Sequence, residues 1–174
     1  MVTHMNRLGC DLSLNSSGIV LVSPANKLLR AELIKPSKAV MSLPAERRGP
    51  ARRNEIGKAF TRLVGECVKQ FGPLEATLEH LAHSKAAKNV KAAVTLVELA
   101  KWHGLAESLL YVLGIHNESI AVSHCRLWLC GQGNVDKEAV AHRIKVDYGI
   151  KFDGDPGFDL SDAALLALWA NRKR

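Results

Sequence analysis

Four carboxylates in this sequence have the chemistry and the setting that a divalent-metal centre needs. Asp11 interrupts an apolar segment, Glu79 ends another, and Asp159 and Asp162 begin a third near the end of the chain. The i, i+3 spacing of the last two places both on one face of a helix. Carboxylate oxygens are the ligands that Mg²⁺ and Mn²⁺ prefer, and two such ions about 4 Å apart can hydrolyse a phosphodiester. The pattern therefore predicts a nuclease-type metal centre, provided that the fold brings the four residues together.

Each of these residues also has a simpler interpretation. Asp11 and Glu79 could be exposed residues of strands. Asp159 could be the N-cap of a helix, and acidic residues in a first turn stabilise the helix dipole. The combination of four carboxylates favours the metal interpretation, because like charges gathered in one place repel each other until a divalent cation neutralises them.

The overall charge of the chain fits a polyanionic partner. Its 174 residues include 24 Lys and Arg against 17 Asp and Glu, which gives a net charge of +7. In a nuclease, a basic rim would bind phosphates around an acidic centre that binds metal. Two basic clusters are candidates for this rim, although an exposed loop and an exposed helix start are the simpler interpretations. The residues of these clusters are Arg47, Arg48, Arg52 and Arg53, and then Lys85 and Lys88.

Hydrophobic periodicity predicts the elements that must position these side chains. Three short strands joined by turns are expected at residues 8–14, 19–22 and 28–34, followed by a loop over residues 36–50. Helices are expected at residues 55–71, 85–113, 135–148 and 159–171, and two further strands at residues 74–81 and 119–123. This order predicts a single α/β domain over residues 1–174. Its mixed five-stranded sheet would have three antiparallel strands followed by parallel strands, with helices on its faces.

Cysteine use and hydropathy indicate a reducing compartment. None of the four cysteines belongs to a CxxC pair, so reduced thiols are expected. The first ten residues lack the apolar core of a signal peptide, and no apolar run is long enough to span a bilayer. We therefore expect a cytoplasmic protein, or one in an organelle or a viral host's cytosol, that is not secreted and has no membrane partner. The helix at residues 85–113 is apolar on more than one face, which supports a homodimer.

Four segments together resemble the motifs of the RuvC family of Holliday junction resolvases. Residues 9–18 (GCDLSLNSSG) are similar to the first-strand motif G-x-D-x-S/G-L-x-x-T/S-G, and residues 76–79 (ATLE) to the second acidic motif, an apolar strand ending in Glu. Residues 131–140 (GQGNVDKEAV) resemble the stretch G-x-G-x-x-x-K-x-x-V. Residues 159–168 (DLSDAALLAL) resemble the terminal motif D/H-x-x-D-A-x-x-x-A. The four segments occur in the family's order and span nearly the whole chain.

The resemblance implies a ribonuclease H-like fold and a divergent member of the family, such as a viral or organellar one. The catalytic ligands of two Mg²⁺ ions, for which Mn²⁺ would substitute, would be Asp11, Glu79, Asp159 and Asp162. Lys137 would be a further catalytic residue that contacts the DNA backbone near the scissile phosphate. Arg126 matches another basic, DNA-binding position. RuvC enzymes are homodimers that nick two strands of a four-way junction symmetrically, so the resemblance implies a homodimer that acts on branched DNA.

One departure from the family concerns the loop after the second acidic residue. The family often has an aromatic residue there, in a loop that opens the junction, whereas residues 80–83 of this chain are HLAH. Three other functions stay open: a nuclease specific for flaps or forks, a junction-binding module without catalysis, and a ribonuclease H acting on RNA–DNA hybrids. The four carboxylates argue against the module, because clustered negative charge facing phosphates is of no use to a protein that only binds DNA.

Overall fold

Five strands form one mixed sheet in the computed structural model, which describes residues 5–81 and 90–172. β1 (Asn6–Asp11), β2 (Ser17–Val22) and β3 (Leu28–Ile34) pair antiparallel as a meander. β4 (Leu74–Glu79) pairs parallel with β1, and β5 (Asn117–Ile120) pairs parallel with β4. The spatial order of the strands is β3-β2-β1-β4-β5. The predicted α/β class and the predicted mixed sheet are therefore confirmed.

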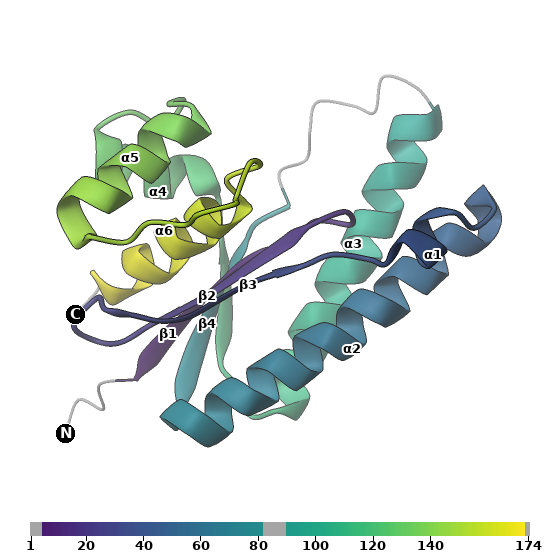
Figure 1. Ribbon diagram of the computed structural model, residues 1–174, viewed down its shortest axis with the longest axis horizontal. Helices are drawn as coiled ribbons and strands as arrows, with labels where there is room; N and C mark the ends of the chain where they lie inside the picture. The colour runs from purple at the N-terminus through teal and green to yellow at the C-terminus, as the bar shows by residue number, and fades with distance from the viewer. Residues whose placement is uncertain (1–4, 82–89, 173–174) are drawn as a thin grey trace.

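Helices cover both faces of this sheet (Figure 1). α2 (Ala45–Phe71) and α3 (Val90–Val112) lie on one face. α4 (Val122–Cys130), α5 (Lys137–Tyr148) and α6 (Asp159–Asn171) lie on the other. Each face has its own cluster of buried apolar residues, because successive side chains of a strand point to opposite sides.

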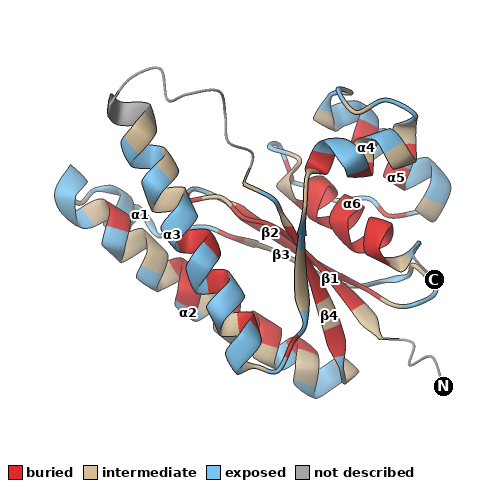
Figure 2. Cartoon of the chain, turned by 180° about the vertical axis from the view of Figure 1, so that it is seen from behind, coloured by how far each residue is buried: buried red, intermediate tan, exposed pale blue. Residues whose placement is uncertain are grey.

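The alternation of side chains along β1 decides where Asp11 points. Leu8, Cys10 and the following Leu12 are buried in the cluster that includes residues of α2 and α3, such as Phe60 and Trp102. The side chain of Asp11 therefore lies on the other face of the sheet, on the side of α6. Figure 2 shows how completely this region is buried, with α6 enclosed along most of its length.

The prediction of a loop over residues 36–50 is wrong. Lys38–Met41 form a short helix, α1, whose N-terminus is capped by the hydroxyl of Ser37. α2 begins soon afterwards and continues through Pro50. Pro50 removes one backbone hydrogen bond, a loss that a long helix tolerates near its start. Arg47, Arg48, Arg52 and Arg53 therefore belong to the N-terminal half of α2 and not to a loop.

A second error concerns residues 119–130. The strand predicted at residues 119–123 lies earlier in the chain and ends at Ile120, and α4 occupies the residues that follow it. Val122, Cys125 and Leu129 are buried on the inner side of α4 at helical spacing. The helix has only 9 residues, too few for its periodicity to stand out beside the β-branched residues that precede it.

Two further features bear on the sequence-based expectations. All four cysteines are free thiols, and three of them are buried. Within residues 5–81 and 90–172, no helix is long and apolar enough to cross a membrane.

α6 packs against β1 and β2 so closely that two glycines are required. A methyl group on Gly9 would overlap the backbone carbonyl of Ala163, and one on Gly18 would overlap the backbone carbonyl of Asp159. Helix and strand backbones are therefore in direct contact. Where α6 faces Gly9 it carries two small residues, Ala163 and Ala167. This contact fixes the first turn of α6 beside the end of β1.

Gly9→Ala tests this contact. The added methyl group would push α6 away from the sheet, so we expect the free energy of unfolding to fall by about 3 kcal/mol or more. Urea denaturation followed by circular dichroism measures the change. Gly65→Ala is the matched control, because nothing lies within 4 Å of a methyl group there. In the middle of α2 it should stabilise the protein by up to about 1 kcal/mol. Equal effects of the two substitutions would contradict the proposed contact.

Candidate active site

Asp11 and Glu79 lie side by side at the ends of two neighbouring strands. β1 and β4 run parallel, and their register pairs Cys10 with Leu78, so the next residue of each strand is a carboxylate. Asp11 is only 6% exposed, and Glu79 is half-buried. The simpler interpretation of Asp11 as an exposed strand residue is therefore wrong.

This pair carries more negative charge than its surroundings readily accept. Burial raises the pKa of Asp11 well above its usual range, and the hydrogen bond to Glu79 and the charges of Glu79 and Asp162 raise it further. The positive charge of Lys137 acts in the opposite direction and only partly offsets these effects. A site of this kind favours a bound cation or proton.

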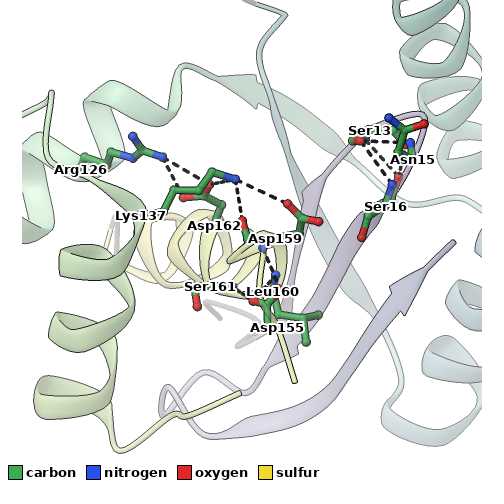
Figure 3. Close-up of polar contacts among 12 residues, drawn as sticks. Ser13, Asn15, Ser16, Arg126, Lys137, Asp155, Asp159, Leu160, Ser161 and Asp162 are labelled. Carbon is green, nitrogen blue, oxygen red and sulfur yellow. Dashed lines mark hydrogen bonds and ion pairs between the residues drawn. The ribbon is translucent and has the colours of Figure 1, made fainter. Parts of the chain in front are cut away.

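Asp159 and Asp162 project from the first turn of α6 toward the ammonium group of Lys137, the first residue of α5 (Figure 3). Nζ of Lys137 lies 2.9 Å from Oδ2 of Asp162 and 3.5 Å from Oδ1 of Asp159, and it donates to the carbonyl oxygen of Gly157 at 3.2 Å. Burial alone would lower the pKa of Lys137, but the hydrogen bond to Asp162 and the neighbouring carboxylates raise it overall. The ammonium is therefore a stable counter-charge for the acidic cluster.

Arg126 of α4 binds the same carboxylate from the other side (Figure 3). Its Nη2 donates to Oδ1 and Oδ2 of Asp162 at 3.1 and 3.3 Å, and its Nη1 donates to the carbonyl oxygen of Val135 at 3.1 Å. Asp162 is thus held between two cations, and its side chain is only 4% exposed.

Capping of α6, the simpler role considered for Asp159, belongs to another residue. The carboxylate of Asp155 accepts hydrogen bonds from the backbone N–H groups of Asp159 and Leu160 at 3.0 Å, and of Ser161 at 3.3 Å. Asp155 is buried, and the side chain of Asp159 makes no capping bond. Sequence reasoning missed Asp155, although the turn sequence Asp-Pro-Gly just before a helix start could have indicated it. Asp159 and Asp162 are left available for other partners.

The Arg-rich part of α2 has mixed surroundings. Arg47 is exposed, whereas Arg48 donates to the carbonyl oxygen of Leu43 at 2.8 Å through Nη2. Arg53 forms an ion pair with Glu98 of α3. Arg52 donates to Oδ1 of Asn15 at 2.9 Å. Burial, together with the charges of Arg48 and Arg53, lowers its pKa. Asn15 follows Asp11 by four residues, so this basic cluster reaches the turn beside the acidic site.

Lys85 and Lys88, the second predicted basic cluster, lie outside the described residues. The fold brings Asp11, Glu79, Asp162, Asp159 and Lys137 into one neighbourhood, joined by Arg126. Over residues 5–81 and 90–172, however, no three His, Cys, Asp or Glu side chains already have an arrangement that could hold a metal ion. Asp162 points its oxygens at Lys137 and Arg126.

Solved structures of two kinds of resolvase superpose on nearly all of this chain. Thermus thermophilus RuvC matches with a TM-score of 0.70 and 21% identity over 98% of this chain and 96% of its own. The same protein in complex with a Holliday junction substrate matches with a TM-score of 0.68 and 22% identity, over 98% and 97%. The chain has the RuvC fold. No family model and no curated protein sequence matches it.

A less similar structure is that of the yeast mitochondrial Holliday junction resolvase Ydc2, with a TM-score of 0.55 and 12% identity. The match covers 97% of this chain and 78% of the yeast protein. These likenesses confirm the ribonuclease H-like fold that the motifs predicted. The roles of the individual site residues stay predictions, because identities this low establish the fold alone.

Asp155→Ala tests the capping arrangement that frees the two carboxylates of α6. The substitution removes the acceptor of three backbone N–H groups, so we expect a loss of about 2 kcal/mol of stability. Asp155→Asn keeps one acceptor oxygen and should lose less. Asp153→Ala is the control, because Asp153 is exposed in the same loop and pairs with the exposed Lys151. Chemical denaturation that finds Asp155→Ala as stable as Asp153→Ala would contradict the capping role.

Proposed function

We propose that this chain is a divalent-metal-dependent endonuclease that resolves four-way DNA junctions. The observation that carries the proposal is that the carboxylates of Asp11, Glu79 and Asp162 lie close together. They come from β1, β4 and α6, and those of Asp11 and Asp162 are buried. The RuvC fold supports the proposal, since the Thermus thermophilus protein of that fold has been solved in complex with a Holliday junction substrate.

The donors of this site fit a hard divalent cation. Asp11, Glu79, Asp159 and Asp162 would hold two Mg²⁺ ions, with Mn²⁺ as a substitute, because all four offer only carboxylate oxygens. Burial raises the pKa of Asp11 most, and the charges of Glu79 and Asp162, which raise it further, are charges that such ions would neutralise. When bound, two divalent ions activate a water for attack on a phosphodiester and stabilise the leaving oxygen.

Lys137 is the cation of the site that a substrate phosphate can reach. Its side chain is 40% exposed, and its single ammonium group is shared among Asp162, Asp159 and the carbonyl of Gly157. In our proposal, Lys137 moves from these carboxylates to a phosphate oxygen when DNA and metal are bound. It then holds the scissile strand in place, and the carboxylates it releases are free to bind metal.

The basic residues of α2 would bind the backbone of the same DNA further from the cut. Arg47 is exposed, and Arg52 contacts the β1–β2 turn next to Asp11, so both are placed to extend a phosphate path from the site. Arg48 and Arg53 would contribute charge to this path, although Arg53 also ties α2 to α3 through Glu98. Lys85 and Lys88 stay predicted members of the same surface.

The first experiment is cleavage of end-labelled DNA in Mg²⁺ or Mn²⁺. We expect paired, symmetric nicks in a four-way junction, and little or no cutting of a flap, a linear duplex or an RNA–DNA hybrid. Asp162→Asn and Glu79→Gln should each lower the rate at least about 100-fold, because each removes a metal ligand. Asp147→Asn is the matched control, since Asp147 pairs with Arg143 on the exposed side of α5.

Each other outcome changes a specific part of the proposal. Preference for a flap or a hybrid would keep the metal centre and replace the substrate. Tight junction binding without cleavage in either metal would overturn the enzyme and leave a binding module.

We propose further that the active unit is a homodimer formed through α3. The inner side of this helix is buried at Trp102, Ala106 and Leu110, but an apolar stripe on its outer side is left exposed by the residues that the structure describes. The stripe residues and their exposure are Val94 (58%), Val97 (52%), Leu105 (36%) and Val112 (79%). They recur at helical spacing, and Leu105 also lines a groove of about 520 Å³ between α2 and α3. An exposed apolar stripe of this kind is typical of a protein interface.

Sedimentation velocity at micromolar concentration tests this interface. We expect the wild type to be a dimer and the double variant Val97→Glu, Leu105→Glu to be a monomer, because two carboxylates would be buried without partners. Val146→Glu is the control, since Val146 is an exposed valine (61%) on α5, away from α3. A wild-type monomer, or a dimer that survives the double substitution, would contradict the α3 interface.

A further inference from the structure

Arg126 uses its guanidinium group inside the protein. The two arms of the group bind different partners, Nη2 the carboxylate of Asp162 and Nη1 the carbonyl oxygen of Val135. These contacts join three segments, namely α4, the loop before α5, and the first turn of α6. The side chain is 18% exposed, and its Nε is buried. Little of the group remains for a ligand.

Lys137 binds the same carboxylate but differs from Arg126 in its exposure and in the form of its charged group. Its side chain is 40% exposed, against 18% for Arg126, and it ends in one ammonium group on a flexible stem. An ammonium can turn to a new acceptor by rotating its stem, whereas the planar guanidinium of Arg126 would have to give up its bonds to two segments at once. The two cations on Asp162 are therefore not equivalent.

We infer that Arg126 is a positioning residue that fixes the carboxylate of Asp162, and that it is not a phosphate contact. The inference rests on the proposed function, because it assigns Asp162 as a metal ligand. It replaces the expectation, from the family resemblance, that Arg126 binds DNA. Arg126 contacts both oxygens of Asp162 and holds the carboxylate in a constant orientation, while the ammonium of Lys137, which shares Oδ2, can be exchanged. Loss of such a supporting contact lowers metal affinity or activity by about 10- to 100-fold.

Two readouts separate this role from a phosphate contact. The first is the affinity of the free protein for Mn²⁺, measured by calorimetry, which does not depend on DNA. The second is the salt dependence of junction binding in EDTA, where no cleavage occurs. Loss of one phosphate contact makes the slope of log K against log salt shallower by about 0.9, and loss of a residue that only positions Asp162 leaves the slope unchanged.

Arg126→Gln and Arg126→Lys are the informative variants. We expect both to weaken Mn²⁺ binding about 10-fold or more and to leave the salt slope at its wild-type value. Arg126→Lys keeps the charge but cannot reach Asp162 and Val135 together, so it should not restore Mn²⁺ affinity. Arg143→Gln is the matched control. Arg143 pairs with Asp147 on the outer side of α5, so its loss should change neither readout by much.

The opposite pattern would overturn the inference. A shallower salt slope with unchanged Mn²⁺ affinity, restored by Arg126→Lys, would make Arg126 a phosphate contact. If Arg126→Gln fails to fold, as judged by circular dichroism, Arg126→Lys decides by the same two readouts. A wild type that binds Mn²⁺ but neither binds nor cuts junctions would end the proposed function, and the Mn²⁺ affinities alone would then decide the role of Arg126. A wild type that binds no Mn²⁺ would end both.

Discussion

The backbone-to-backbone packing of α6 on β1 and β2 is the constraint from which the geometry of the site follows. Gly9 and Gly18 have no side chains at the two places where the helix crosses the strands, and Ala163 keeps the helix side equally small. The first turn of α6 therefore starts where β1 ends, and Asp162 comes to lie beside Asp11. A helix held further away by larger side chains would separate the carboxylates and weaken every electrostatic effect that they share.

That packing creates a concentration of negative charge, and the neighbouring residues make it tolerable. Asp155 takes over the capping of α6, so the carboxylates of the first turn are not used up by backbone N–H groups. Arg126 and Lys137 then supply positive charge to Asp162 from two sides. These two cations offset part of the negative charge, and the exposed ammonium of Lys137 is the part of this balance that can be exchanged.

Local patterns in the sequence were sufficient for the sheet and the acidic centre, but not for residues whose roles depend on distant partners. Asp11, Glu79 and Asp162 could be identified because the combination of four carboxylates favours a metal centre, although each of them alone has a simpler interpretation. Asp155 escaped notice because its partners are backbone N–H groups, which no side-chain pattern reveals. The helical character of residues 45–50 was hidden for another reason: Gly49 and Pro50 favour a loop locally, and packing of the long α2 outweighs that preference.

The two faces of the sheet divide the proposed activity between them, and α3 connects the two parts. The α6 face carries the chemistry, while the outer side of α3 carries the apolar stripe of the proposed dimer. On its inner side, Nε1 of Trp102 donates to the hydroxyl of Ser17 at 3.3 Å, and Ser17 closes the turn that follows Asp11. One rigid helix therefore contacts both the interface and the loop beside the carboxylates. In a dimer built on α3, the two acidic sites would be held at a fixed separation, which is the geometric condition for cutting two strands of one junction at matching positions.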